Sequence, residues 1–115
     1  MRRCPTEARR AVFRIVVLAA LAFAAADVAA GTTHQVTIEG MRFNPASLTV
    51  ARGDTIVWVN KDLVAHTATA AGVFDSHEIA PDASWTDVAN TPGRHAYLCT
   101  FHPAMKATLT VKGKR

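Results

Sequence analysis

The stretch Cys99-Thr100-Phe101-His102-Pro103-Ala104-Met105 carries three side chains that can bind a metal ion. Cys99, His102 and Met105 stand three residues apart and offer a thiolate, an imidazole and a thioether. A loop of this length can bring all three side chains around one point, and the fixed backbone angle of Pro103 stiffens it. Thiolate and thioether ligands favour Cu(I), whereas imidazole also suits Cu(II). The spacing therefore points to a site for a redox-active metal.

A fourth ligand has to come from another part of the chain, and His66 is the candidate. It follows Lys61-Asp62-Leu63-Val64-Ala65, at the point where we expect a strand to begin. Two imidazoles and one thiolate in a plane, with a weak axial thioether, make up the copper site that transfers single electrons. The set His66, Cys99, His102 and Met105 therefore predicts one copper ion per chain.

Two other chemistries fit the same residues less well. Zinc sites use harder or more numerous Cys and His ligands, and a Met ligand is unusual for zinc. A nucleophilic pair of Cys99 and His102 would need an orienting acid and an oxyanion hole, and the neighbouring sequence offers neither. Chance packing explains any one of these residues, but it explains their joint spacing poorly. Copper is therefore favoured over zinc and over a catalytic cysteine, and we do not expect an enzyme.

Residues 1–30 have the pattern of a secretory signal peptide. The first 14 residues are rich in arginine, residues 15–26 are an apolar run, and small residues follow. A run of twelve apolar residues is shorter than the roughly 20 needed to span a bilayer. We expect cleavage after Ala30, with Ala26 or Gly31 as alternatives, and a periplasmic protein that does not span a membrane. The pair Arg9-Arg10 does not decide between the general secretory and the twin-arginine export routes.

Export changes the interpretation of the cysteines. Cys4 leaves with the signal peptide, so Cys99 is the only cysteine of the mature chain. A single thiol cannot form an internal disulfide, and in an oxidising compartment a free thiol is open to oxidation. A buried structural cysteine is the alternative, and the metal-binding neighbours of Cys99 argue against it.

Charge and length limit the function classes. Of the formal net charge of +4, residues 1–30 carry +3 and residues 31–115 carry +1. The only basic run of the mature chain is Lys112-Gly113-Lys114-Arg115, so we expect no binding to nucleic acid. Residues 31–115 suffice for one small core and no more. The sequence therefore predicts a single domain over residues 31–115, which we expect to be a monomer.

The mature chain alternates apolar and polar residues with a period of two, which is typical of strands. We expect strands over residues 36–38, 47–50, 55–60, 66–69, 84–88, 94–99 and 106–111, and a loop over residues 72–83. About seven short strands at this spacing predict an all-β, Greek-key β-sandwich. Cys99 then ends one strand, and the ligand loop leads into the next.

The domain resembles the cupredoxins, the small blue copper proteins, and is most similar to their amicyanin and plastocyanin branch. The resemblance spans residues 36–111 and rests on a set of short motifs. These are Met41-x-Phe43-x-Pro45, Gly53-Asp54-Thr55, Trp58-x-Asn60, Phe74-Asp75-Ser76, Ile79-Ala80-Pro81, Pro92-Gly93 and Cys99-Thr100-x-His102-Pro103-x-Met105.

The resemblance implies that His66, Cys99, His102 and Met105 are the copper ligands and that the fold is cupredoxin-like. It also implies that Thr67 and Thr100 tie the two ligand segments together by a hydrogen bond. The implied function is a periplasmic carrier of single electrons between redox proteins such as an amine dehydrogenase, a c-type cytochrome or a copper reductase. A periplasmic carrier or resistance protein that delivers copper instead of electrons is the alternative.

Three positions depart from the amicyanin pattern. Phe101 stands where amicyanin has a proline, Thr67 replaces the commoner asparagine, and His95 replaces the usual aromatic residue. We expect Phe101 to face solvent beside the metal and His95 to be a core histidine with a hydrogen-bond partner, which binds no metal. These departures bear on which partner protein binds, and they do not change the expected copper ligands.

Overall fold

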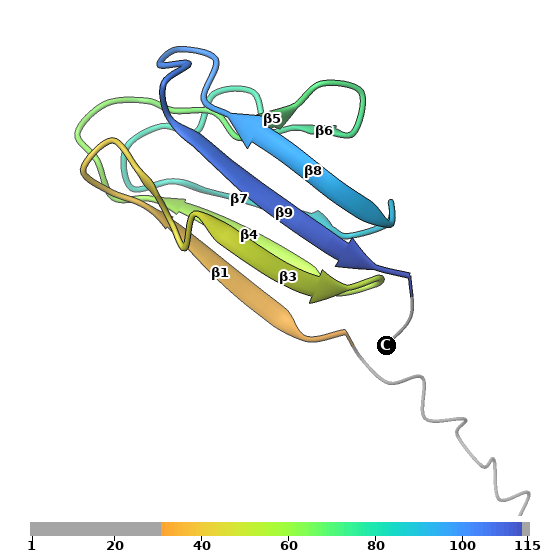
Figure 1. The fold of residues 1–115 in the computed structure, drawn as a ribbon. Coiled ribbons are helices and arrows are strands. Elements are labelled where there is room, and N and C mark those ends of the chain that lie inside the picture. The colour runs from red at the N-terminus through yellow and green to blue at the C-terminus, as the bar shows by residue number, and fades with distance from the viewer. Residues whose placement is uncertain (1–30, 114–115) are drawn as a thin grey trace, which may run out of the picture.

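Two β-sheets pack face to face in the computed structural model of the protein, which describes residues 31–113 (Figure 1). The expected signal peptide lies outside the described residues. Residues 31–113 contain no helix, and therefore no helix that could cross a membrane. The predicted all-β sandwich is confirmed.

The first sheet has four strands in the order β2-β1-β4-β7. Strand β1 (Thr33–Ile38) lies parallel to β4 (Thr55–Asn60), while β2 (Phe43–Asn44) and β7 (Ser84–Val88) pair antiparallel at the two edges. Strands β1 and β4 are neighbours in space although β2 and β3 separate them in the chain, so this sheet contains a crossover.

The second sheet has five strands in the order β3-β9-β8-β5-β6. Its members are β3 (Ser47–Ala51), β9 (Lys106–Lys112), β8 (Gly93–Leu98), β5 (Thr69–Ala70) and β6 (Phe74–Asp75). Strand β3 runs parallel to β9, and the other pairs are antiparallel. Because β8 and β9 are paired, the loop that joins them is held at one end of the sheet.

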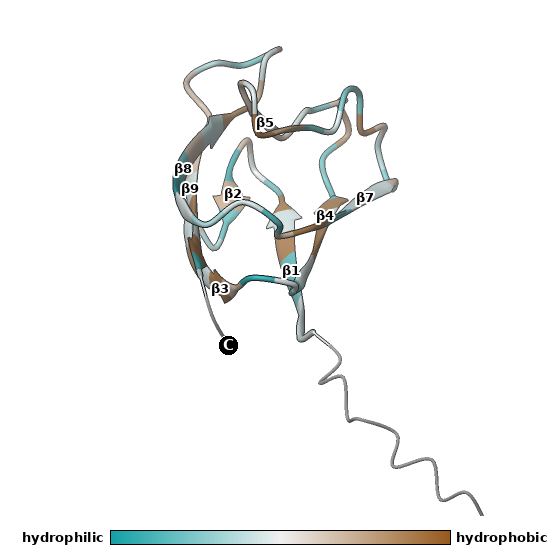
Figure 2. Cartoon of the chain, turned by 90° about the vertical axis from the view of Figure 1, so that its right-hand side faces the viewer, coloured by the Kyte–Doolittle hydropathy of each residue, from teal (hydrophilic) through white to brown (hydrophobic). Residues whose placement is uncertain are grey.

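Alternating side chains of both sheets meet in the core between them. In β4, Ile56, Trp58 and Asn60 are buried, and apolar residues colour this strand brown in Figure 2. The Trp58 ring contacts those of Trp85 and Tyr97, with centroid distances of 5.1 and 6.0 Å. Trp58 is therefore a core residue, and Trp85 packs against the core.

The segment that carries His66 differs from the prediction. Residues 66–69 were expected to form one strand, but β5 covers only Thr69–Ala70, and His66 makes an isolated bridge with Ile79. The strand is shorter because the Ala68 N–H donates to the Ser76 hydroxyl at 2.7 Å, in place of a backbone carbonyl of a neighbouring strand. The predicted loop over residues 72–83 also contains the short strand β6.

Candidate metal centre

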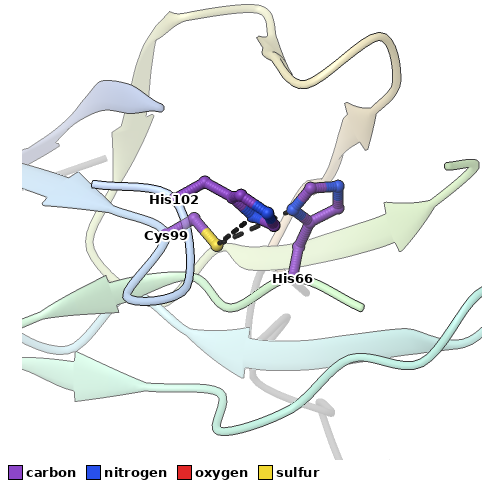
Figure 3. A group of neighbouring side chains, drawn as sticks. All are labelled: His66, Cys99 and His102. Carbon is purple, nitrogen blue, oxygen red and sulfur yellow. Dashed lines mark hydrogen bonds between the residues drawn. The ribbon is translucent and has the colours of Figure 1, made fainter. Parts of the chain in front are cut away.

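Three of the four predicted ligands lie together at one end of the sandwich. Cys99 follows the last residue of β8, His102 lies on the β8–β9 loop, and His66 precedes β5. Their ligand atoms lie within 4.8 Å of one another (Figure 3). In residues 31–113 no other three His, Cys, Asp or Glu side chains cluster in this way.

The geometry of this cluster fits a metal ion bound by one sulfur and two nitrogens. Cys99 Sγ lies 3.7 Å from His66 Nδ1 and 3.8 Å from His102 Nδ1. The two imidazole rings lie 5.1 Å apart at an angle of 61°. Cys99 and His66 are fully buried, whereas His102 is partly exposed. A mixed thiolate and imidazole set of this kind suits copper.

Met105, the fourth predicted ligand, is fixed at the far end of the same loop. The Cys99 N–H donates to the Met105 carbonyl at 3.1 Å, and the Met105 N–H donates to the His102 carbonyl at 2.8 Å. These bonds close the loop on itself, and the Met105 side chain is buried. A soft thioether is thereby held next to the segment that carries Cys99 and His102.

The Cys99 sulfur receives a hydrogen bond from the backbone. The Thr67 N–H donates to Cys99 Sγ at 3.3 Å, and Thr67 directly follows His66. A hydrogen bond to the sulfur stabilises the thiolate and tunes the potential of a bound metal. Thr67, the residue after His66, therefore acts on the sulfur of Cys99.

A pair of threonines joins the two ligand segments, as the resemblance implied. Thr67 Oγ1 accepts the Thr100 N–H at 2.8 Å and lies 3.1 Å from Thr100 Oγ1. Thr69 Oγ1 also lies 3.0 Å from Thr67 Oγ1. Because Thr67 follows His66 and Thr100 follows Cys99, these bonds fix the positions of His66 and Cys99 relative to each other.

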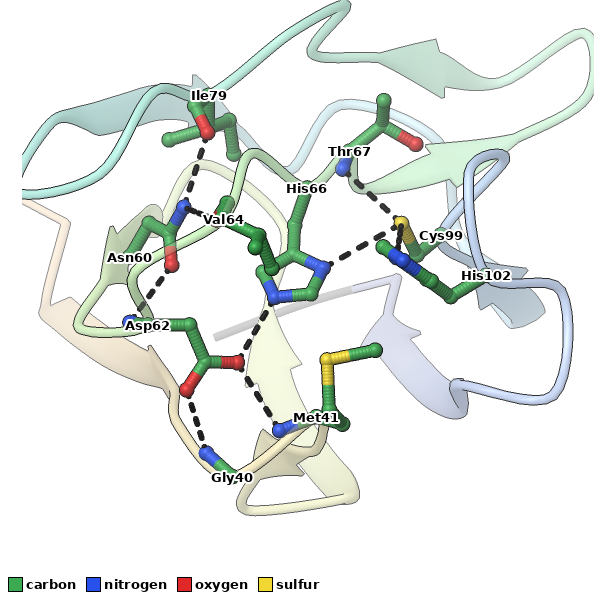
Figure 4. Close-up of polar contacts among 10 residues, drawn as sticks. All are labelled: Gly40, Met41, Asn60, Asp62, Val64, His66, Thr67, Ile79, Cys99 and His102. Carbon is green, nitrogen blue, oxygen red and sulfur yellow. Dashed lines mark hydrogen bonds and ion pairs between the residues drawn. The ribbon is translucent and has the colours of Figure 1, made fainter.

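Asp62 orients His66, and the sequence analysis gave it no role. Asp62 Oδ2 lies 2.8 Å from His66 Nε2 (Figure 4). A carboxylate at this position places the imidazole proton on Nε2 and leaves the Nδ1 lone pair facing Cys99 and His102. The sequence feature that could have indicated this role is the position of Asp62, an acidic residue four positions before His66.

Asp62 is itself held by the turn between β1 and β2. Its Oδ1 accepts the Gly40 N–H at 2.7 Å, and its Oδ2 accepts the Met41 N–H at 2.9 Å. Both residues have left-handed φ angles, of 62° and 61°, which aim the two amides at one carboxylate. Burial alone would raise the pKa of Asp62, but the bonds from Met41, His66 and Gly40 lower it below the usual value.

A family model described as a cupredoxin-like domain matches residues 11–111, nearly the whole chain. The chain belongs to the cupredoxin family. An amicyanin from Paracoccus versutus is 30% identical over 105 residues, covering 86% of this chain and 79% of the relative. A plastocyanin from Scenedesmus fuscus is 31% identical over 88 residues, covering 61% of this chain and 86% of the relative.

Solved structures support the same family for this cupredoxin. The Cu(I) form of an amicyanin mutant is 30% identical, covers 78% of this chain and 90% of its own, and has a TM-score of 0.65.

The other histidines of the described cupredoxin domain lie away from the cluster and have their own surroundings. His34 Nε2 lies 2.9 Å from Asp54 Oδ2, and His95 Nε2 lies 2.7 Å from the Thr91 carbonyl. His77 is 87% exposed beside Asp75. His95 has the expected hydrogen-bond partner, but it is only partly buried and does not belong to the core.

Exposed apolar side chains of this cupredoxin lie on the two segments that carry the cluster and on the turn that binds Asp62. Phe101 is 52% exposed, so it faces solvent as we predicted. Val64 and Leu63, exposed by 47% and 95%, lie on the segment before His66, and Met41 is 42% exposed on the turn bound to Asp62. We call these four residues the apolar rim.

Proposed function

We propose that this cupredoxin is a periplasmic blue copper protein that carries one electron at a time between redox proteins. The observation that carries the proposal is the convergence of His66 Nδ1, Cys99 Sγ and His102 Nδ1 within 4.8 Å. These atoms would hold one copper ion, and the buried Met105 thioether would supply a further, weak ligand. Bound copper supplies the chemistry by changing between Cu(I) and Cu(II).

The protein keeps the ligand atoms in one arrangement in both oxidation states. Thr67 and Thr100 lock the two ligand segments together, and Asp62 fixes the ring of His66. The Thr67 N–H stabilises the thiolate charge of Cys99. A site whose ligands suit Cu(I) and Cu(II) about equally has little need to rearrange when the electron moves. No acid, base or substrate is required, so the protein is an electron carrier and not an enzyme.

Electrons leave and enter through His102, which is the partly exposed ligand. Phe101, a residue of the apolar rim, directly precedes His102 in the chain and is exposed for contact with a partner. A partner that docks here brings its own redox centre close to the imidazole edge. By the chemistry of the family, the partner is an amine dehydrogenase, a c-type cytochrome or a copper reductase.

The alternative function is delivery of copper to an acceptor. Delivery requires ligands that can be exchanged, but Cys99 and His66 are fully buried and tied by several hydrogen bonds. This favours an electron carrier, which keeps its copper.

Repeated redox cycling in the presence of a Cu(I) chelator tests the proposal. The protein is loaded with copper, reduced and reoxidised several times, and the copper retained is measured after gel filtration. We expect a reversible one-electron potential with copper retained. Loss of Cu(I) to the chelator in the first cycle would favour the copper carrier instead.

A further inference from the structure

Copper passes the apolar rim on its way to the buried ligands. Cys99, His66 and Met105 are buried, whereas His102 is partly exposed. An incoming ion therefore meets the His102 side of the cluster first. Three of the four rim residues have hydrocarbon side chains, which cannot bind a metal ion. Met41 is the exception, because its thioether sulfur is a soft donor.

We propose that Met41 is an entry ligand for copper, which binds incoming Cu(I) at the surface and passes it to His102 and Cys99. This inference rests on the proposed function and deepens it, because it describes how the same site is filled. It also specifies the oxidation state of the metal that enters, since a thioether favours Cu(I) over Cu(II).

The backbone of Met41 is fixed next to the metal centre. The Met41 N–H donates to Asp62 Oδ2 at 2.9 Å, and the same oxygen lies 2.8 Å from His66 Nε2. One carboxylate oxygen thus separates the Met41 backbone from the ring of a predicted ligand. Figure 4 shows the Met41 side chain directed from the turn between β1 and β2 toward the rings of His66 and His102. A methionine side chain has three rotatable bonds, so its sulfur can move between solvent and these rings.

Met41 has a backbone conformation that residues other than glycine rarely adopt. Its φ angle is 61°, in the left-handed region. Gly40, the residue before it, has a φ of 62°, so a second glycine would suit position 41 without strain. The Met41 side chain is 42% exposed and does not belong to the hydrophobic core. Core packing therefore does not explain a methionine at this strained position, whereas a donor for an incoming metal ion does.

The transfer from Met41 to the buried ligands is an exchange of ligands without a change of oxidation state. The bond between Cu(I) and the Met41 sulfur breaks as bonds to His102 Nδ1 and Cys99 Sγ form, and the Cys99 thiol releases its proton to water. His102 Nδ1 and Cys99 Sγ lie 3.8 Å apart, so one ion can bind both. A thiolate and imidazoles together bind Cu(I) more tightly than a single thioether, and the transfer is therefore favourable.

The rate at which the metal-free protein takes up Cu(I) tests the proposal. Cu(I) in dilute acetonitrile is mixed with the protein without oxygen, and the ultraviolet absorption of the new bond between Cu(I) and the Cys99 thiolate is followed by stopped flow. Met41→Leu removes the sulfur and keeps the apolar bulk. Groups around a metal site change metal affinity by about 10–100-fold, and we expect Met41→Leu to slow Cu(I) uptake by the lower figure, about tenfold. Uptake of Cu(II) should change by less than about twofold, because a thioether favours Cu(I).

Two variants control for effects other than the loss of the sulfur. Leu63→Ala shortens another rim side chain, which is 95% exposed and has no donor atom, so Cu(I) uptake should stay at the wild-type rate. Met41→His supplies a new donor at the same position. It should restore Cu(I) uptake and also speed the uptake of Cu(II), because imidazole suits both. If Met41→Leu takes up Cu(I) as fast as the wild type, or if Leu63→Ala slows uptake equally, Met41 serves only as an apolar surface and the inference is wrong.

Nuclear magnetic resonance detects contact between Met41 and the metal without any electron transfer. Met41 and Met105 are the two methionines of residues 31–115, so labelling of the methionine methyl groups gives one signal for each in the mature chain. Comparison with Met41→Leu assigns the two signals. In Cys99→Ser, which cannot complete the transfer, added Cu(I) should shift the Met41 signal. A Met41 signal that stays in place while the Met105 signal moves would overturn the inference.

Failure of this inference and failure of the proposed function give different results. A protein that takes up copper in neither oxidation state would overturn the proposed function itself. A protein that fills with copper and becomes coloured on oxidation, but takes up Cu(I) at a rate independent of Met41, would overturn only the entry ligand.

Discussion

The substitution Asp62→Asn removes a negative charge beside His66 but keeps an oxygen atom that can accept the hydrogen bond from the His66 Nε2–H group. In the native protein this carboxylate accepts three hydrogen bonds, from His66, Gly40 and Met41. An asparagine oxygen at the Oδ2 position can keep the bonds to His66 and Met41. Its NH₂ group then faces the Gly40 N–H, so one donor meets another donor.

The expected magnitude follows from the role of Asp62 behind the ligand. Loss of such an outer partner costs about 10–100-fold in metal affinity. Cu(II) carries the larger charge, so it loses more affinity than Cu(I) when the carboxylate charge is removed. If Cu(II) affinity falls about tenfold more than Cu(I) affinity, the reduction potential rises by about 59 mV. We therefore expect Asp62→Asn to raise the potential by roughly 60 mV.

Redox titration followed by the visible absorption of the copper protein measures this shift. Asp82→Asn is the control, because it removes the same charge from an exposed position outside the network of His66. We expect its potential to stay within about 15 mV of the wild-type value, since an exposed charge is screened by solvent and salt. A potential that is unchanged or lower in Asp62→Asn would refute the assignment of Asp62 as the residue that orients and polarises His66.

Three further predictions use other parts of the site and the core. Met105→Gln should keep copper but lower the potential, because a harder oxygen donor stabilises Cu(II); an unchanged or higher potential would mean that Met105 is not axial. Phe101→Ser should slow electron transfer to the physiological partner with the spectrum and potential nearly unchanged, whereas Val88→Ser, at a site on β7 that is 42% exposed compared with 52% for Phe101, should have no effect. Tyr97 is the only tyrosine, and burial raises its pKa to about 12 despite the hydrogen bond from Trp58, so ultraviolet titration should show no ionisation near pH 10. Since only the unfolded chain ionises between pH 10 and 12, the free energy of unfolding should fall with rising pH by up to about 3 kcal/mol.

The sequence predicted the sandwich and the cluster because both leave short-range signals. Alternation over residues 55–60 and 106–111 predicted two strands, and the structure has them as Thr55–Asn60 and Lys106–Lys112. The spacing of Cys99 and His102 placed two ligands on one loop, and the structure brings them together.

The parts that the sequence did not predict depend on contacts between distant segments. His66 sits in an isolated bridge because its partner, Ile79, comes from a loop and not from a strand. The role of Asp62 depends on the amides of Gly40 and Met41, which are 22 and 21 residues away. Local patterns carry no information on such pairings.

The absorption spectrum of the copper-loaded, oxidised protein tests the central claim most directly. A short bond between copper and the Cys99 thiolate, in a plane with two imidazoles, should give an intense charge-transfer band in the red part of the visible spectrum. Cys99→Ser should abolish the colour, while far-ultraviolet circular dichroism shows that the sandwich is still folded. A wild-type protein that binds Cu(II) and stays colourless would contradict the account.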